Sequence, residues 1–349
     1  MTVISIIIAI FVFSFIIIFH ELGHFSFAKM FDVQVNEFTL GFGPTIIGKQ
    51  VGETLFAWKL LPFGGSCAME GEDEESDSPR AFNKKKIWQK FLIVFFGPGF
   101  NFILAFLLSL LLTGVAGVDL PIVDTVIDGS PAYEAGVLPG DEIISLGGEK
   151  VNFYRDVRLY TVTDAGKTAT MTLMRDGVEY SYTITPAYSE ETGRYTYGVS
   201  WSGERTKVGF FDTIRYSLYE VGYWIKYVIK SLGMMVTGRV SANDISGPVG
   251  IVKTIGDTVI ASSESGALYV FLNVLNISIL LTANLGVMNL LPFPALDGGR
   301  LVMFIIEAIR RKPLPVKVEG AINMAGLMLL FGLMFLILFN DVRKIIFPV

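Results

Sequence analysis

The hydrophobic positions of this chain gather in long uncharged runs that are separated by polar segments. Four runs are long enough to cross a bilayer, which takes about 20 residues in a helix. They cover residues 3–19, with an apolar continuation to 27, and then 91–118, 267–296 and 321–339. A segment in lipid must satisfy its own backbone hydrogen bonds, so each run is expected to be helical. The pattern predicts a polytopic α-helical membrane protein with about four transmembrane helices.

The composition agrees with that prediction. Of 349 residues, 52% are hydrophobic and 17% are charged, whereas soluble domains are about one quarter charged. The single cysteine, Cys67, excludes a disulfide framework and a cysteine-based metal site. The chain before His20 has neither a basic region nor a small-residue cleavage site, so we expect a retained span. The expected surroundings are a lipid bilayer, and no nucleic-acid partner is expected.

Basic residues are concentrated in two of the polar segments. The segment between the first two runs holds Lys29, Lys49, Lys59, Arg80, Lys84, Lys85, Lys86 and Lys90. The segment between the last two runs holds Arg300, Arg310, Arg311, Lys312 and Lys317. Because lysine and arginine collect on the cytoplasmic side, loops 29–90 and 297–320 are predicted to be cytoplasmic. Arg343 and Lys344 weakly oppose this orientation.

The first basic segment also has the character of β-structure. Residues 40–49 and 54–69 alternate, are largely apolar and are punctuated by glycine, which predicts strands and turns. Open strand edges cannot face lipid, so a membrane-associated hairpin or sheet must lie against protein or a wet cavity. A plain cytoplasmic hairpin is the alternative. The acidic run at 70–77 is typical of a solvated loop.

Residues 119–202 have the composition of a soluble domain. Signals for a strand, a short helix and a Gly-Asp turn follow one another, and Asp176-Gly177 marks a hairpin. The segment suits one small α+β domain, and its place between the second and third runs makes it extracytoplasmic. Residues 203–266 mix apolar, aromatic and charged residues, which predicts amphipathic helices on the outer membrane surface. The predicted divisions are 1–118, 119–202, 203–266 and 267–349.

The sequence HELGH at 20–24 lies within the first apolar run. On a helix, His20 and His24 share one face, so both rings can reach one metal ion, and Glu21 lies beside that face. This is the arrangement of a zinc-dependent peptidase. The alternative is coincidence, with both histidines as ordinary core residues. Because the chain has only these two histidines, the metal site is the favoured interpretation.

Polar residues interrupt two other apolar runs. The sequence FFGPGFN at 95–101 places Asn101 at membrane depth, after glycines and a proline that weaken helical hydrogen bonding. Helix packing through these small residues is the alternative. The third run carries Asn273, Asn276, Asn284 and Asn289 and ends in NLLPFPALDGGR at 289–300. Its two prolines prevent a regular helix through 292–294, which implies a cavity nearby.

Asp297 is the only acidic residue between Glu264 and Glu307. An unpaired carboxylate in a span costs about 2.5–3.5 kcal/mol, which a bound cation would offset. Two neutral imidazoles would leave a zinc ion with its full charge in a setting of low dielectric constant, so a carboxylate ligand is needed. We therefore expect Asp297 to be the third ligand. The alternative is that it caps a helix that begins near Gly299.

Together these motifs resemble the site-2 protease family of intramembrane zinc metalloproteases, in its bacterial form with an extracytoplasmic PDZ domain. The matching sequences are HELGH at 20–24, GPGFN at 97–101, GSPAYEAGVLPGD at 129–141, SGPVGI at 246–251 and NLLPFPALDGG at 289–299. They follow the family's order over nearly the whole chain. This chain has one PDZ-sized domain, where the long members of the family have two.

The resemblance implies Zn²⁺ as the cofactor. It also implies that the protein cleaves single-span membrane proteins in regulated intramembrane proteolysis. The implied substrates are either anti-sigma factors or remnant signal peptides. The candidate site residues are the zinc ligands His20, His24 and Asp297, the catalytic base Glu21, and the substrate-binding Asn289, Asn284 and Asn101. Residues 54–61 are expected to hold the substrate extended by strand addition. Two alternatives stay open: a peptidase that acts on soluble peptides, and a metal-dependent membrane scaffold or transporter whose PDZ domain recruits partners.

Overall fold

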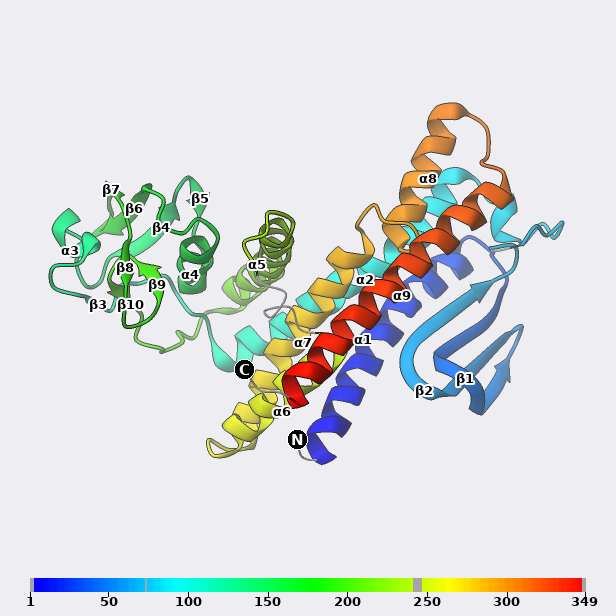
Figure 1. Cartoon of the computed structure of the whole chain (residues 1–349), viewed down its shortest axis with the longest axis horizontal. Helices are drawn as coiled ribbons and strands as arrows, with labels where there is room; N and C mark the ends of the chain where they lie inside the picture. Colours follow the sequence, from blue (N-terminus) through cyan, green and yellow to red (C-terminus); the bar gives the residue numbers. More distant parts are fainter. Residues whose placement is uncertain (1–2, 73, 241–246, 347–349) are drawn as a thin grey trace. The chain divides into compact units, whose positions relative to one another are not determined.

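The computed structural model describes residues 3–72, 74–240 and 247–346 (Figure 1). It divides into two compact units, and each is described by itself. The first unit comprises Met1–Leu108 with Val240–Val349, and the second comprises Ser109–Arg239. Ser246, which begins the motif SGPVGI, lies outside the described residues, and the rest of that motif belongs to the first unit.

Four helices of the described chain are long and apolar enough to cross a membrane. They are α1 (Val3–Met30), α2 (Ile87–Ala116), α7 (Ala267–Asn289) and α9 (Val316–Ile346). Each coincides with a predicted apolar run, so the prediction of a polytopic helical membrane protein is confirmed. Contrary to the weakening expected at the GPG sequence, α2 continues through Pro98. A proline removes one backbone hydrogen bond, and neighbouring groups can support the rest of the helix.

Small residues bring α1 and α2 close together. A Cβ atom on Gly23 would lie 2.0 Å from the carbonyl oxygen of Phe96, so only glycine permits this crossing. Beside it, the rings of Phe27 and Phe96 stack with their centroids 3.7 Å apart. The alternative that small residues serve helix packing therefore describes this part of α2. Helix α6 (Pro248–Ser263) packs against α1, α7 and α9.

Between α1 and α2 the chain forms the predicted β-structure. Strands β1 (Val35–Val51) and β2 (Thr54–Met69) are antiparallel and pack against α1 (Figure 1). A short 3₁₀ helix, η1 (Phe82–Lys84), precedes α2. One end of the sheet enters a buried apolar cluster that also contains Ile93 of α2 and Phe304 of α8 (Asp297–Arg310). This cluster ties the sheet to the helices that carry the motifs.

The two strands fold back on themselves, so the sheet is wider than its two labels suggest. Residues 37–40 pair with 55–58 on one side and with 65–68 on the other. Residues 55–58 pair in addition with 47–50, so both of their edges are occupied. No described strand pairs with the outer side of 65–69. We call residues 65–69 the edge strand. Of the free edges of the sheet, it lies nearest the start of the loop that follows β2.

A tight turn joins α7 to α8. Two prolines lie in it, as the sequence predicts, and Ala295 adopts a left-handed φ of 72°, which is costly for a residue with a side chain. A Cβ atom on Gly298 would lie 2.2 Å from a carbonyl oxygen of the turn. The turn also touches α9, where a Cβ atom on Gly326 would lie 2.5 Å from Pro294. Backbone packing on both sides therefore fixes the start of α8.

The second unit contains a small α+β fold followed by a long helix. Its elements are β3 (Thr125–Val126), α3 (Pro131–Ala135), β4 (Glu142–Leu146), β5 (Glu149–Lys150), α4 (Tyr154–Thr163), β6 (Ala169–Arg175), β7 (Val178–Ile184), β8 (Ala187–Ser189), β9 (Arg194–Thr196), β10 (Val199–Ser200) and α5 (Phe210–Val236). The main sheet has the order β5-β4-β6-β7, while β3 pairs with β10 and β8 with β9. Ile143, Leu146, Met171 and Leu173 are buried at its core.

Local sequence explains the predicted elements of this fold. The Ser130 hydroxyl caps α3 by accepting the Tyr133 N–H at 3.3 Å, and Gly136 ends the helix with a φ of 87°. Asp176 and Gly177 form the β6–β7 turn with φ values of 50° and 78°, as a two-residue type I′ hairpin requires. The predicted order of strand, helix, turn and hairpin is observed.

A buried ion pair holds the Gly-Asp turn of the second unit. The Arg175 guanidinium lies 2.6 Å from Asp141 Oδ1, and the Leu138 N–H donates to Asp141 Oδ2 at 2.8 Å. Burial by itself would raise the pKa of Asp141, but these hydrogen bonds hold that pKa below its usual range. The turn is thereby fastened to the hairpin.

Helix α5 is attached to the α+β fold by its charged face. The attachment consists of ion pairs, among them Arg155–Glu220, Lys226–Asp156 and Lys230–Glu149. The sequence placed residues 203–266 together as amphipathic helices on the membrane surface. In the structure, charged residues of α5 have protein partners in the second unit, and α6 belongs to the first unit. The location of these helices on the membrane surface stays a prediction.

Candidate active site

The two histidines of HELGH point at one another from successive turns of α1. Their side chains are buried, and their Nε2 atoms lie 3.2 Å apart. The rings are nearly perpendicular, with an interplanar angle of 86°. A helix places residues i and i+4 on the same face, so the geometry predicted for His20 and His24 is observed.

Asp297 meets this histidine pair from the other half of the first unit. Its Oδ2 atom lies 3.3 Å from His20 Nε2 and 3.6 Å from His24 Nε2. This oxygen is buried and has no hydrogen-bond partner, as expected for an atom that serves a cation. The N-cap of α8 is Leu296, and Asp297 lies in the first turn. The structure therefore does not place Asp297 at the capping position.

The three ligand atoms have the spacing of a zinc site. Their separations are 3.2, 3.3 and 3.6 Å. Four ligands about 2.0–2.1 Å from a tetrahedral zinc ion lie about 3.3 Å from one another. Two imidazoles and one carboxylate are also the donor set of catalytic zinc sites, which keep a fourth position for water. Among the residues that the structure describes, only this group has such an arrangement.

Helix α2 supports the outer side of His24. The Nδ1–H of His24 donates to the carbonyl oxygen of Ile93 at 2.9 Å, which leaves Nε2 free to bind a metal. The ring lies against Gly97, where a Cβ atom would come within 2.2 Å of His24 Nε2. Gly97, the first glycine of GPGFN, is therefore required by the close approach of the His24 ring.

The predicted substrate-binding asparagines lie at different distances from His20, His24 and Asp297. Asn101 is fully buried, with its Nδ2 atom 3.0 Å from His20 Nδ1 and its oxygens near the Thr282 hydroxyl. Asn289, at the end of α7, has its Nδ2 atom 3.5 Å from His20 Nε2. The side chain of Asn284 makes no hydrogen bond with the described residues. The structure thus brings Asn101 and Asn289 to the histidines, while Asn284 lies more than one turn before Asn289 in α7.

A cavity of about 360 Å³ opens beside His20, His24 and Asp297. Glu21 lines it together with the three ligand residues, the edge strand, Glu72 and Arg300. A Cβ atom on Gly65 would lie 2.8 Å from Glu21 Cγ, so the edge strand packs directly on this glutamate. The Glu21 carboxylate accepts no hydrogen bond from the described residues. The cavity therefore holds a free carboxylate and the ligand atoms side by side.

Sequence reasoning missed several residues of this site. Neither Ile93, whose carbonyl oxygen holds His24, nor Thr282 belongs to a recognisable sequence motif. The sequence favoured 54–61 over the edge strand at 65–69, but residues 55–58 of that segment have both edges occupied within the sheet. The only signal for it was the Gly64-Gly65 pair, since glycine in a strand often marks a close backbone approach.

Replacement of Gly97 by alanine is expected to disable the site. The new methyl group would overlap the His24 ring, and a displacement of about 1 Å at a reacting centre costs about 10²-fold in rate. Zinc content and peptide cleavage of the purified protein measure the effect. Gly114→Ala in the same helix is the matched control, because nothing lies within 4 Å of its Cβ position. Equal activity of the two variants would contradict the prediction.

Comparison with known proteins agrees with this geometry. The family model for peptidase family M50 matches residues 8–333. A candidate zinc metalloprotease of Clostridium acetobutylicum is 37% identical over 342 residues, 98% of each chain. The zinc metalloprotease RasP of Geobacillus kaustophilus is 28% identical, with 97% of this chain and 98% of its own covered. The regulator of sigma-W protease RasP of Bacillus subtilis is 27% identical, with 96% and 97% covered.

Both the extent of these matches and the ligand geometry lead to one assignment. The family model covers most of the chain, including both halves that contribute ligands, and the relatives align over nearly their full length. The chain therefore belongs to peptidase family M50, the site-2 protease family of zinc metalloproteases.

Proposed function

We propose that this protein is an intramembrane protease that hydrolyses peptide bonds in or near the transmembrane segments of single-span membrane proteins. The observation that carries the proposal is the cavity in which Glu21 lies beside three converging zinc-type ligands. Two of those ligands are on α1, which is apolar enough to span a membrane. One relative is named as a regulator of sigma-W protease, which supports a membrane-bound anti-sigma factor as substrate in regulated intramembrane proteolysis.

The residues of the site divide the chemistry between them. His20 Nε2, His24 Nε2 and Asp297 Oδ2 would hold the zinc ion. When bound, zinc acts as a Lewis acid on the scissile carbonyl and lowers the pKa of water to about 7. The Glu21 carboxylate takes the proton of the attacking water and returns it to the leaving amine. The Asn289 amide, which lies close to His20, would donate a hydrogen bond to the developing oxyanion.

Asn101 is better suited to position His20 than to bind substrate. With a metal on His20 Nε2, the ring proton lies on Nδ1, and a turn of the Asn101 amide presents its oxygen there as the acceptor. Thr282 holds the asparagine from α7. Because the Asn101 side chain is fully buried, this role explains it without a substrate contact.

The edge strand is the proposed binding site for the substrate backbone. A helical substrate hides its carbonyl groups and must be extended before cleavage, and an unpaired strand edge offers it main-chain hydrogen bonds. Residues 65–69 line the cavity and have one unpaired side. The role first expected of 54–61 therefore passes to the edge strand.

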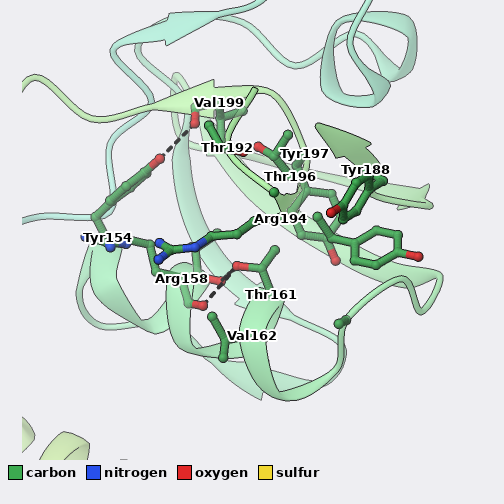
Figure 2. Close-up of a pocket in the computed structure, with 14 residues that line it drawn as sticks. Tyr154, Arg158, Thr161, Val162, Tyr188, Thr192, Arg194, Thr196, Tyr197 and Val199 are labelled. Carbon is green, nitrogen blue, oxygen red and sulfur yellow. Dashed lines mark hydrogen bonds between the residues drawn. The ribbon is translucent and has the colours of Figure 1, made fainter. Parts of the chain in front are cut away.

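For the α+β fold of the second unit we propose a PDZ-like role in substrate selection. A groove of about 490 Å³ lies between α4 and the β8–β9 hairpin (Figure 2). The Tyr154 hydroxyl crosses one end to donate to the Val199 carbonyl at 2.8 Å. Arg158 and Arg194 also line it. A groove between a helix and a strand suits an extended peptide.

Val162→Trp is expected to block this groove and change which membrane proteins are cut. The indole ring would fill the groove, so cleavage of groove-dependent substrates should fall about tenfold, while zinc content stays the same. Competitive cleavage of a set of single-span proteins measures the change. Val178→Trp is the control, since both valines are about half exposed and Val178 does not line the groove. An unaltered cleavage pattern in Val162→Trp would argue against substrate selection by this groove.

We further propose that loops 29–90 and 297–320 face the cytoplasm and that the second unit is extracytoplasmic, on the evidence of the basic loops. In a Cys67→Ser background, a new cysteine from Ser76→Cys is expected to resist a membrane-impermeant thiol reagent in intact cells. After lysis it should react fully. Labelling of intact cells would reverse the orientation.

The experiment that tests the proposed function is cleavage of purified single-span proteins, with soluble peptides and remnant signal peptides as competing substrates. Preferential cleavage of the single-span proteins is expected. A preference for soluble peptides would favour the alternative of a peptidase that acts on soluble peptides. The scaffold or transporter hypothesis requires that the protein binds zinc but cuts none of these substrates. The presence of Glu21 in the cavity argues against that hypothesis, because a pure binding site has no need of a base.

A further inference from the structure

The active-site cavity contains an ion pair that the chemistry of Glu21 and the zinc ligands does not use. Arg300 Nη1 on α8 pairs with Glu72 Oε1, and both side chains line the cavity. Their side chains are only 20% and 14% exposed. A fully solvated ion pair contributes little to stability. Separation of a pair that is shielded from water leaves an uncompensated charge in poorly solvated surroundings, which is unfavourable. The pair therefore holds together the segments that carry it.

Each partner belongs to a different wall of the cavity. Arg300 follows Asp297 by one turn of α8, so it is fixed to the third zinc ligand. Glu72 follows the end of β2, and its other oxygen, Oε2, accepts the Met69 N–H at 3.3 Å. Met69 is the last residue of the edge strand. The pair thus connects the edge strand to the turn that presents Asp297.

We propose that Glu72 and Arg300 are positioning residues, and that their ion pair is a clasp that fixes the edge strand beside the metal ligands. This inference rests on the proposed role of the edge strand in holding substrate. A peptide paired with the strand then reaches Glu21 in one register. A misplacement of about 1 Å is enough to cost about 10²-fold in rate, so the clasp serves proteolysis without touching the reacting atoms.

Cys67 provides a readout that does not depend on proteolysis. It is the only cysteine of the chain, lies in the edge strand, lines the cavity and is 7% exposed. Burial raises the pKa of its thiol, which slows its reaction with electrophiles. The rate at which N-ethylmaleimide alkylates the full-length protein in detergent therefore reports how often the edge strand moves away from the metal ligands.

Arg300→Gln and Glu72→Gln are each expected to accelerate alkylation of Cys67 about tenfold and to lower kcat by roughly 10–100-fold, with KM nearly unchanged. Bound zinc and Tm should stay close to those of the native protein. The double variant should be no worse than the more affected single variant, because both changes remove the same contact. Arg300→Lys retains the charge and should recover most of kcat.

Lys59→Gln is the matched control. Lys59 pairs with Glu37 at 3.1 Å within the same sheet, and neither residue lines the cavity. This variant should leave both the alkylation rate and kcat unchanged. Faster alkylation in Lys59→Gln would show that any lost ion pair loosens the sheet, which would overturn a specific clasp.

Three other results would overturn the clasp: an unchanged alkylation rate in Arg300→Gln, loss of zinc in that variant, or additive effects in the double variant. Loss of zinc would make Arg300 part of the metal site, and additivity would give the two residues separate roles. Faster alkylation with an unchanged kcat would uphold the clasp and refute the proposed substrate role of the edge strand. The two proposals can therefore fail independently.

Discussion

Glu21→Gln is expected to lose nearly all proteolysis while the protein stays folded and zinc-loaded. The three zinc-type ligand atoms come from His20, His24 and Asp297, so removal of the Glu21 charge leaves the ligand set complete. Glutamine has the same shape as glutamate, and the edge strand that packs on Glu21 Cγ keeps its contact. A general base contributes about 10²–10⁴-fold to the rate, and cleavage should fall by that factor.

The measurement combines zinc stoichiometry, a melting curve and the rate of cleavage of a single-span protein. Glu307→Gln is a suitable control, because Glu307 is a buried glutamate of the same unit that accepts the Leu314 N–H at 2.7 Å and does not line the cavity. The control should cut substrate at close to the native rate. Near-native turnover in Glu21→Gln would refute the peptidase mechanism and favour a binding role for the metal.

Asp297→Ala is expected to strip both zinc and activity from the protein. Its Oδ2 atom is the one anionic member of the three-atom group, and the two histidines alone would leave the ion without charge compensation. The bound zinc should fall from about one ion per chain to nearly none after dialysis, and cleavage should fall with it. Metal analysis of the purified variant measures the first effect directly.

A purely structural role for Asp297 makes a different prediction. Loss of a helix cap costs about 0.5–2 kcal/mol of stability and would leave zinc in place. Asp341→Ala provides the comparison, because Asp341 is a buried aspartate of the first unit that accepts backbone N–H groups from Gly247 and Gly250. That variant should melt at a lower temperature yet retain zinc. Full zinc occupancy and retained cleavage in Asp297→Ala would refute its assignment as a ligand.

What the sequence could predict of this site depended on contacts that are local in the chain. The helical spacing of His20 and His24 follows from one turn of helix, and the prolines after Asn289 are incompatible with a continued helix. Asp297 could be proposed because charge is scarce in the apolar runs, so the energetic argument had one candidate. The four apolar runs likewise identified the four helices that are long and apolar enough to span a membrane.

The remaining features depend on pairings between distant segments, which no local pattern specifies. Whether 54–61 or 65–69 has a free edge is decided by how the strands fold back, and both sequences are equally β-like. The charges of α5 fit a membrane surface as well as they fit a protein partner, and only the partner's position decides between them. The Glu72–Arg300 pair joins an acidic loop to α8 in the same way.

The packing of Gly326 on Pro294 has a consequence for the order of events during synthesis. The histidine pair lies on α1 and is synthesised before Asp297, but the turn that presents Asp297 rests on α9, which is synthesised after it. A nascent chain that lacks α9 has no surface to brace that turn. The position of Asp297 beside the two histidines therefore depends on a contact with a helix that follows it in the chain.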